Sequence, residues 1–413
     1  MDYDYFLSKV SKARQPSPIR ALVPLVKTPG MISLGAGNPN PNSFPFKSMT
    51  VTLNNGQNYT IAGDDMADAL QYGPTPGLPA LREWLHNFQN TIHEPPTKSF
   101  DLCVGTGSQD LLAKTLEALI SPDDYVLIEN PTYTGTLAFL RSQPCNLVEV
   151  ETDDQGLIPD SLYSILDNWD HTQRFPKILY TVPVGGNPTG ISTTIERKQQ
   201  IYGYAQKFNI LIIEDDPYYY LQFNSPRIKS YLSMDTDGRV VRFDSMSKLL
   251  SAGIRIGWAT GPAPIIDRIN LHTQATNLQP SSLAQMVIYK LLEQWGVDEF
   301  LKHADSVASL YKEKRDAFLA CANRHLTGTC AQWVVPNAGM FVWIKLPGID
   351  DTKDLIHNKA LEKKVLAVPG ELFLPRPRPS SYVRVSYSNV STADMDEGLK
   401  RLSQLIRECQ TST

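Results

Sequence analysis

The sequence predicts an α/β protein in which a large domain, with a mostly parallel sheet between helices, precedes a smaller α+β domain. Between about residues 100 and 262, short β-rich runs alternate with segments of helical period. A long helical pattern follows, and short strand patterns come after it. The length of 413 residues suits two or three packed units rather than one small core.

The β-rich runs of the first part are separated by turn-forming or helical segments, as in βαβ units. These runs cover residues 101–105, 125–129, 177–182, 210–214, 239–243 and 256–260. Apolar residues return every three or four positions over 108–120, 194–208 and about 298–324, so we expect helices there. Later strands are expected at 333–335, 339–346, 365–368 and 382–386. We therefore expect an N-terminal arm (1–45), a large domain (46–290) and a small domain (291–413).

The composition excludes several classes of protein. Hydrophobic residues make up 42% of the chain and charged residues 20%, which is typical of a globular protein. Lys plus Arg number 39 against 43 Asp plus Glu, without a basic block, so no nucleic-acid partner is expected. No apolar run approaches the length of a membrane span, so no membrane association is expected.

The cysteines and the first residues bear on the compartment. The 5 cysteines are scattered and form no C-x-x-C pair, which argues against a disulfide framework and a zinc site. The histidines show no ligand spacing either, so no metal is expected. Asp2 and Asp4 are unlike an Arg-rich transit peptide, although basic residues follow from Lys9 onward. We expect a cytoplasmic protein, and a mitochondrial address stays open.

In open α/β sheets, ligands bind beyond the carboxyl ends of the parallel strands. Run 101–105 leads to Ser108 and Gln109 at the start of a helix, where a hydroxyl and free N–H groups suit a phosphate. An ordinary N-cap serine is the alternative. Run 125–129 leads to Tyr133, whose ring either stacks on a flat cofactor or only packs.

Three further runs also end in polar residues. Run 177–182 leads to glycines and Asn187, which could donate to a ligand oxygen or mark a simple turn. Run 210–214 leads to Asp215 and Tyr218, and a carboxylate at a buried strand end requires a positive partner. The residues after run 239–243 include two hydroxyls and two cations, namely Ser245, Ser247, Lys248 and Arg255. Their joint occurrence at successive strand ends argues against chance.

With these residues the chain resembles pyridoxal-phosphate (PLP) aminotransferases of fold type I, class I. The matching segments are Asn187-Pro188-Thr189-Gly190, Asp215-x-Pro217-Tyr218, Ser245-x-Ser247-Lys248 with Arg255, and Arg384 within 382–386. Segments 14–20, 39–42 and 213–219 most resemble kynurenine/α-aminoadipate aminotransferases, and fungal aromatic aminotransferases share much of the pattern. The resemblance covers essentially the whole chain.

The resemblance implies PLP as cofactor and a ping-pong transfer of an amino group to a 2-oxo acid such as 2-oxoglutarate. The implied donor is an L-amino acid of the aminoadipate, aromatic or kynurenine type. Lys248 then bonds the cofactor and moves the proton at the substrate Cα, while Asp215 pairs with the ring nitrogen. Tyr218 and Asn187 hold the ring oxygen, and Tyr133 stacks on the ring. The implied phosphate ligands are Ser108, Gln109, Ser245, Ser247 and Arg255.

The resemblance also implies where substrate binds. Arg384 grips the substrate α-carboxylate through paired hydrogen bonds. Tyr72 reaches the phosphate of a neighbouring subunit, which implies a homodimer with composite active sites. Residues near the substrate side chain are Gly37, Arg20, Asn187 and Phe341, and Arg20 either binds a distal carboxylate or only anchors the arm. Asn38 stands where kynurenine-type relatives carry leucine, which makes that wall polar.

Two alternatives remain beside the aminotransferase interpretation. One is a non-transaminating PLP enzyme, such as a lyase, on the same scaffold. The other is a PLP-sensing transcription regulator, which carries this domain behind a DNA-binding head. The aminotransferase-type region begins within the first 20 residues and the net charge is -4, so we expect no such head.

Overall fold

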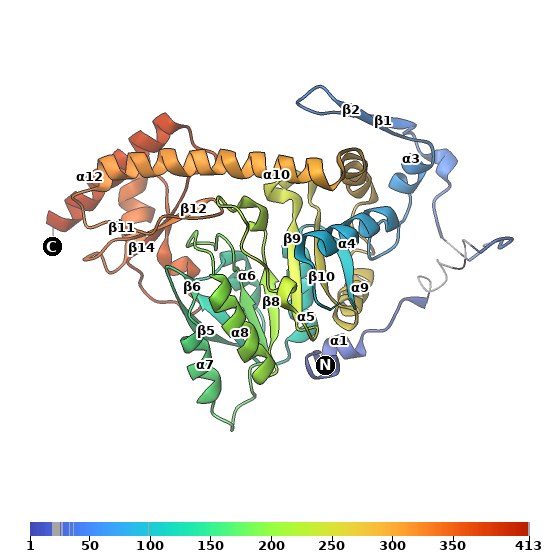
Figure 1. Cartoon of the computed structure of the whole chain (residues 1–413), viewed down its shortest axis with the longest axis horizontal. Coiled ribbons are helices and arrows are strands. Elements are labelled where there is room, and N and C mark those ends of the chain that lie inside the picture. The colour runs from blue at the N-terminus through green and yellow to red at the C-terminus, as the bar shows by residue number, and fades with distance from the viewer. Residues whose placement is uncertain (19–24, 26–27, 33, 36, 98, 412–413) are drawn as a thin grey trace. The chain divides into compact units, whose positions relative to one another are not determined.

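The computed structural model describes residues 1–18, 25, 28–32, 34–35, 37–97 and 99–411. Figure 1 shows the ribbon and labels helices and strands where there is room. The chain forms two compact units, which combine Met1–Ser121 with Leu232–Leu301 and Pro122–Tyr231 with Lys302–Thr413. We call them unit 1 and unit 2. The predicted arm, large-domain and small-domain boundaries stay a prediction.

Unit 1 contains a strand group in the order β3-β10-β9, formed by Phe100–Gly105, Gly257–Pro262 and Val240–Ser245. The central strand β10 is antiparallel to both neighbours. Gly257, its first residue, pairs with Gly105 and with Ser245, the last residues of β3 and β9. The segment that enters β10 therefore lies beside the segments that leave β3 and β9. The sequence predicted these strands to within two residues but did not predict the reversed direction of β10.

The helices of unit 1 are α1 (Lys9–Ala13), α3 (Gly63–Leu70), α4 (Pro79–His93), α5 (Ser108–Leu119) and α9 (Ala263–Thr276), beside a hairpin of β1 (Ser48–Thr52) and β2 (Asn58–Ala62). Helix α5 contacts β3, β9, β10 and α9. Its fully buried face includes Leu111, Leu116 and Leu119. Each buried leucine side chain stabilises the fold by about 1.5–3 kcal/mol. Figure 1 shows α4 and α9 next to β10.

Helix α10 spans Ser282–Leu326 and is interrupted at Gly296, whose φ is 64°. A positive φ costs glycine little, because it has no Cβ. The helix predicted over 298–324 begins just after this break. The structure therefore adds a first segment that the sequence prediction missed.

Unit 2 contains the parallel strands β8 (Leu211–Asp215), β7 (Ile178–Thr181), β4 (Tyr125–Asn130) and β5 (Asn146–Asp153), in that order. The short strand β6 (Gly156–Leu157) is antiparallel to β5. Every residue of β7 and β8 is buried, as expected for parallel strands covered on both faces. The sequence prediction missed β5, because Glu149 and Glu151 interrupt its apolar run.

The helices that accompany these strands are α6 (Thr134–Leu140), α7 (Pro159–Asp167) and α8 (Ile195–Lys207). Helix α8 begins where Thr194 accepts a hydrogen bond from the Arg197 N–H. Such a side-chain cap satisfies a backbone donor that would otherwise lack a partner at the helix start. The predicted helix 194–208 is therefore confirmed within one residue at each end.

A second sheet of unit 2 is antiparallel and has the order β11-β12-β14-β13. Its strands are Gln332–Trp333, Phe341–Lys345, Tyr382–Ser386 and Val368–Pro369, followed by α12 (Thr392–Thr411). The predicted strand 365–368 overlaps the observed strand only at Val368, because β13 covers Val368–Pro369. Lys364 has a φ of 54°, so the chain is still turning just before residue 365.

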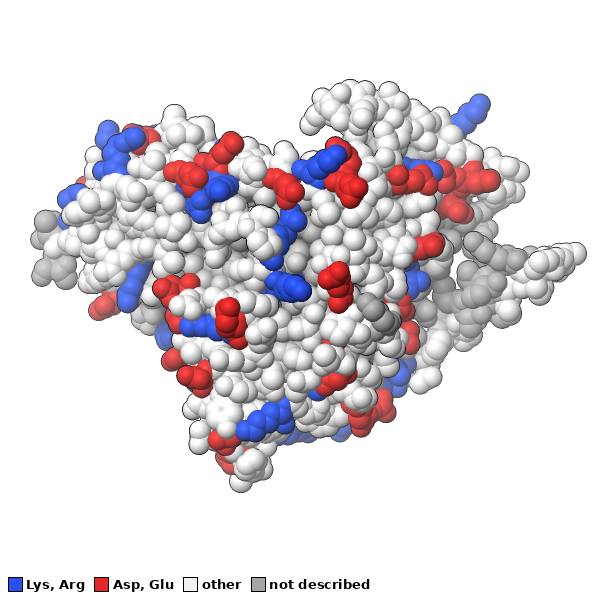
Figure 2. Space-filling view, viewed as in Figure 1, with Lys and Arg blue, Asp and Glu red and all other residues white. Residues whose placement is uncertain are grey.

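The remaining elements are short. They are α11 (Thr352–Asp354), a π-helical turn η7 (Leu355–Ala360) and the 3₁₀ turns η1 (Tyr3–Tyr5), η2 (Pro41–Ser43), η3 (Tyr219–Leu221), η4 (Leu232–Met234), η5 (Met246–Lys248), η6 (Ala252–Ile254) and η8 (Gly370–Phe373). Figure 2 shows basic and acidic side chains interspersed over the face that it displays. Among the described residues, no helix is long and apolar enough to cross a membrane, and no group of His, Cys, Asp or Glu could hold a metal ion.

Candidate active site

The first cluster of predicted site residues lies in unit 1, at the start of α5. Gly107 precedes this helix with a φ of 86°, and Ser108 and Gln109 are its first residues. The guanidinium of Arg255 donates to the Thr106 carbonyl oxygen at 3.1 Å and to the Ser247 hydroxyl at 3.2 Å. A Cβ at position 107 would clash with this guanidinium, so the close approach requires glycine. A cation therefore lies beside a helix N-terminus.

Gly257 brings β10 close to the same helix start. An ideal Cβ at this position would lie 2.6 Å from the Ser108 nitrogen, so a larger residue would push the two segments apart. Gly257 also pairs with Ser245, whose Oγ accepts a hydrogen bond from the Ser247 N–H at 3.2 Å. The hydroxyls, the N-terminal end of α5 and the guanidinium form a donor set that suits a phosphate group.

Lys248 ends the short helix η5, directly after Ser247. Burial lowers the pKa of its amine, and the positive charge of Arg255 lowers that pKa further. A lowered pKa increases the fraction of neutral amine, which is the form that acts as a nucleophile or base.

The second cluster lies in unit 2, where Asp215 ends β8 and is only 4% exposed. Tyr180 of β7 donates from its hydroxyl to Asp215 Oδ2 at 2.8 Å. Thr136 of α6 donates to the Tyr180 hydroxyl, also at 2.8 Å. The sequence analysis missed Tyr180 and Thr136. The available signal was a tyrosine inside an otherwise apolar core strand, because a buried hydroxyl requires a partner.

Arg384 of β14 joins the small sheet to the loop after β7. Its Nη1 donates to Asn187 Oδ1 at 2.9 Å, and its guanidinium lies 4.3 Å from the Phe341 ring and 5.0 Å from the Phe373 ring. Burial lowers the Arg384 pKa. Its buried Nε has no hydrogen-bond partner among the described residues. A guanidinium held in this way retains a donor for an incoming anion.

Two tyrosines complete the second cluster. The Tyr218 ring meets the Phe341 ring edge-on, with the centroids 6.1 Å apart. Burial raises the Tyr218 pKa, as do Tyr133 and Asp215, so its hydroxyl stays protonated. Tyr133 precedes α6, and an ideal Cβ at Gly135 would lie 2.5 Å from the tyrosine ring, so the ring folds back over this glycine.

The predicted residues therefore gather within each unit. Unit 1 brings together Ser108, Gln109, Ser245, Ser247, Lys248 and Arg255, and unit 2 brings together Tyr133, Asn187, Asp215, Tyr218, Phe341 and Arg384. Gly37 and Tyr72 are exposed in unit 1. Arg20 lies outside the described residues. Phe373 was missed, because no motif marks it and only folding brings it to Arg384.

The groups gathered in each unit suit different parts of PLP. A helix start with hydroxyls and a guanidinium suits the phosphate, a buried carboxylate suits a protonated ring nitrogen, and a lysine with a lowered pKa suits the carbonyl carbon. Groups of these kinds are typical of PLP-dependent enzymes.

Comparison with known proteins identifies the family. The model of the family "Aminotransferase class I and II" matches residues 29–402. The chain is 46% identical to the mitochondrial kynurenine/alpha-aminoadipate aminotransferase of Mus musculus, over 99% of this chain and 100% of that protein. Its fold resembles that of the aromatic aminotransferase Aro9 from C. albicans, with a TM-score of 0.90, 26% identity and coverage of 100% and 99% of the two chains.

A third relative bears on the cofactor. It is the alpha-aminoadipate aminotransferase LysN of Thermus thermophilus, solved with N-(5'-phosphopyridoxyl)-L-leucine, with a TM-score of 0.75, 27% identity and coverage of 84% and 85%. The chain belongs to the class I and II aminotransferases. It is thus a PLP-dependent aminotransferase, and the predicted fold class, with a large, mostly parallel sheet and a smaller antiparallel one, is confirmed. The predicted kinship with kynurenine/aminoadipate and aromatic aminotransferases is also confirmed.

Proposed function

We propose that the enzyme takes the amino group from an L-amino acid with an aminoadipate, aromatic or kynurenine side chain and passes it to a 2-oxo acid such as 2-oxoglutarate. The observation that carries this proposal is the half-buried Arg384 guanidinium, which lies 4.3 Å from the Phe341 ring and 5.0 Å from the Phe373 ring and retains a donor at its buried Nε. This arrangement suits an α-carboxylate beside an apolar or aromatic side chain. The names of the mouse, C. albicans and Thermus relatives support the same donor classes.

PLP, when bound, supplies an electron sink for the charge that develops at the substrate Cα. In the proposed assignment, the neutral Lys248 amine would remove the proton from the substrate Cα and deliver it to C4′ of the cofactor. Asp215 keeps the ring nitrogen protonated, and Asn187 and Tyr218 hold the ring oxygen. Tyr133 covers the ring face. The proposed phosphate ligands are Ser108, Gln109, Ser245, Ser247 and Arg255.

Arg384 is proposed to bind the α-carboxylate with two parallel hydrogen bonds. Such a grip fixes which bond at Cα stands perpendicular to the cofactor ring, and so which bond breaks. The Asn187 amide and the aromatic rings hold the guanidinium before substrate arrives. Binding then costs little rearrangement of this side chain.

The substrate side chain is proposed to meet Gly37, Asn38, Arg20 and Phe341. Arg20 either pairs with the distal carboxylate of aminoadipate or anchors the arm, and Asn38 adds a polar group. A panel of amino donors separates these roles, because only a dicarboxylate offers Arg20 a second anion.

We propose that the active form is a homodimer in which Tyr72 reaches the phosphate site of the other subunit. Several large apolar side chains of unit 1 are exposed, and they include Ile32 (84%), Leu34 (96%), Phe46 (62%) and Tyr72 itself (53%). Exposed apolar surface of this kind is typical of a protein interface. We propose that a second copy of the chain packs against these exposed apolar side chains.

The decisive experiment separates transamination from other PLP chemistry. The purified enzyme is incubated with an amino donor until its absorbance shows the pyridoxamine form, and a 2-oxo acid is then added. Return of the PLP spectrum with formation of a new amino acid supports the proposal. Release of ammonia or loss of a side-chain fragment without this return would instead indicate a lyase on the same scaffold.

We propose a cytoplasmic location for the enzyme. The alternative is a mitochondrial location, because the mouse relative is named as a mitochondrial enzyme. Fractionation of source cells against marker enzymes decides between the compartments. Recovery with the mitochondrial marker would overturn the cytoplasmic assignment.

A further inference from the structure

A chain of buried hydroxyls leads from α6 to the carboxylate at the end of β8. Tyr180 and Thr136 are completely buried, and Asp215 nearly so. An ionised carboxylate only accepts hydrogen bonds, so the single hydroxyl hydrogen of Tyr180 points to Asp215. The second contact of this hydroxyl must then be donated by Thr136, as the geometry shows. The direction of both hydrogen bonds is therefore set.

The sheet register explains how Tyr180 reaches this carboxylate. Tyr180 pairs with Ile213 on the parallel strand β8. Ile213 and Asp215 are two residues apart, so their side chains lie on the same face of the sheet as Tyr180. The tyrosine is long enough to span the remaining step toward the carboxyl end of the strand. A shorter residue at position 180 could not make this contact.

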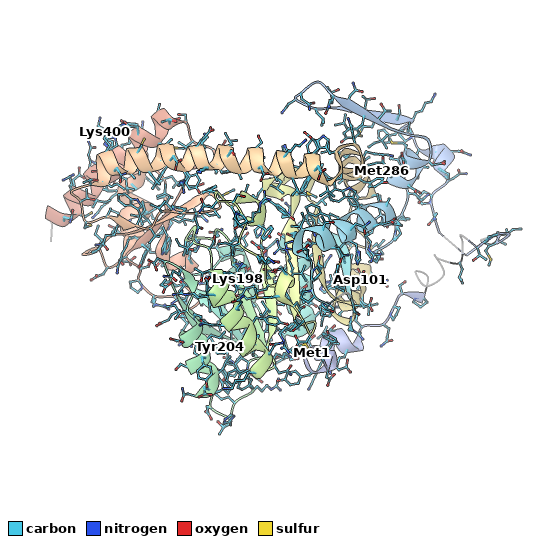
Figure 3. All side chains as sticks on the ribbon, in the orientation of Figure 1. Met1, Asp101, Lys198, Tyr204, Met286 and Lys400 are labelled. Carbon is cyan, nitrogen blue, oxygen red and sulfur yellow. The ribbon has the colours of Figure 1, made fainter. Side chains whose placement is uncertain are left out.

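The opposite face of the same strands carries other polar groups. Thr181 pairs with Glu214 and donates to Glu129, while Lys198 on α8, labelled in Figure 3, donates to the Lys229 carbonyl oxygen at 2.9 Å. Tyr231 also lies on this face, and its backbone N–H donates a hydrogen bond to Glu214 Oε1 at 2.7 Å. Its buried hydroxyl has no hydrogen-bond partner among the described residues. The two buried tyrosines therefore differ. The Tyr180 hydroxyl donates to Asp215, whereas the Tyr231 hydroxyl has no partner among the described residues.

We propose that Tyr180, oriented by Thr136, is a positioning residue that keeps Asp215 ionised and aimed at the cofactor ring nitrogen. This role rests on the proposed pairing of Asp215 with that nitrogen. A buried carboxylate is costly unless hydrogen bonds compensate for the lost water, and the Tyr180 hydroxyl supplies one. Burial and the charge of Asp215 raise the Tyr180 pKa, so the hydroxyl stays a donor in neutral solution.

Loss of this hydroxyl makes the ionised form of Asp215 less stable, so the carboxylate becomes more basic and competes more strongly with the ring nitrogen for the proton between them. A hydrogen bond to a charged group contributes a factor of about 10 to 100 in such an equilibrium. We therefore expect the protonated fraction of the ring nitrogen to fall in the Tyr180→Phe variant. The Thr136→Val variant, which keeps the Tyr180 hydroxyl but loses its orienting donor, should show a smaller change in the same direction.

The experiment loads each variant with PLP carrying ¹⁵N in the ring and records the ring-nitrogen chemical shift at pH 8. The matched control is Tyr231→Phe, which removes a buried tyrosine hydroxyl from the other face of the same strands. Tyr180→Phe should move the shift toward that of the neutral ring and lower kcat about tenfold, with a smaller effect on KM. Tyr231→Phe should leave the shift as in the wild type.

Asp215→Asn separates this role from the proposed function. If Asp215→Asn changes the ring shift but Tyr180→Phe and Thr136→Val do not, Tyr180 is only structural and our inference is overturned. If Asp215→Asn itself leaves the shift unchanged, the pairing of Asp215 with the ring nitrogen fails first. Should Tyr180→Phe not fold, Thr136→Val carries the test, and a wild-type shift in that variant overturns the inference.

Discussion

Arg384 donates from Nη1 to Asn187 Oδ1 at 2.9 Å, although the two residues are 197 positions apart in the chain. The contact ties strand β14 of the small antiparallel sheet to the loop that follows β7. Asn187 is buried, and its amide oxygen accepts from one guanidinium nitrogen and leaves the buried Nε for another acceptor. The side chain proposed to bind substrate is therefore oriented by a side chain proposed to bind the cofactor.

Reduction with borohydride should attach the pyridoxyl group to Lys248 and to no other lysine, because burial and Arg255 lower the pKa of this amine. Peptide mass spectrometry of the reduced enzyme checks this. Lys248→Ala should lower transamination by about 10²- to 10⁴-fold, since the proton-transfer group is lost. The exposed Lys400 gives the control, and Lys400→Ala should keep full activity. Label on another lysine would overturn the assignment.

Arg384→Ala should weaken every amino-acid substrate, because the α-carboxylate is common to all of them. The expected loss in kcat/KM corresponds to about 2–5 kcal/mol when one partner of a desolvated charge pair is removed. Steady-state kinetics with a dicarboxylic, an aromatic and an aliphatic donor measures it. Arg401→Ala removes an arginine from an exposed pair with Glu397 and should change nothing. An equally small effect of both variants would contradict the role of Arg384.

Arg20→Ala should lower kcat/KM for aminoadipate or glutamate far more than for phenylalanine or leucine. An apolar or aromatic side chain offers the guanidinium no anion, whereas a distal carboxylate forms a charge-assisted hydrogen bond. The ratio of the two efficiencies is the readout. Equal losses across the panel would show that Arg20 only anchors the arm.

Two inactive variants should complement each other if the sites are composite. Tyr72→Phe and Lys248→Ala chains, mixed and allowed to exchange, form heterodimers in which one site has both native residues. Random mixing should restore about a quarter of the activity of a dimer with two native sites. Activity assays before and after exchange test this, alongside sedimentation for the mass. No recovery in a sample shown to contain heterodimers would reject the composite site.

Ionisation of Glu129 should lower the free energy of unfolding of the enzyme as the pH rises from about 4.5 to 7. Burial raises the pKa of this carboxyl from 4.5 to about 7, despite hydrogen bonds from Thr181 and Val182. In this window the unfolded chain loses the Glu129 proton while the folded chain keeps it, so folding becomes less favourable by about 3 kcal/mol and then levels off above pH 7. Below pH 4.5 both states keep the proton.

The test is Glu129→Gln, which cannot ionise and can keep both contacts if its amide oxygen accepts from Val182 and its amide nitrogen donates to Thr181. Relative to the wild type, its denaturant midpoint should rise as the pH is taken from 4.5 to 8. Glu397→Gln, in an exposed pair, is the control and should show little pH-dependent difference. A constant difference between Glu129→Gln and the wild type at every pH would contradict the raised pKa.

Much of the fold was visible in the sequence, for a physical reason. Strands buried on both faces are mostly apolar, so β4, β7 and β8 stand out as apolar runs that end in polar residues. Strand β5 was missed because glutamates alternate along it. The predicted helix begins just after the break at Gly296, and the segment of α10 before this glycine was missed.

The sequence by itself determined which residues stand at the strand ends and which family they mark, because strand patterns and turn residues are local properties of the chain. Tertiary structure alone decided the direction of β10, which brings the segment with Arg255 beside the ends of β3 and β9. It also decided that Tyr180 donates to Asp215 and that Phe373 lies against Arg384. These contacts depend on register and packing between distant segments, and no local pattern of residues encodes them.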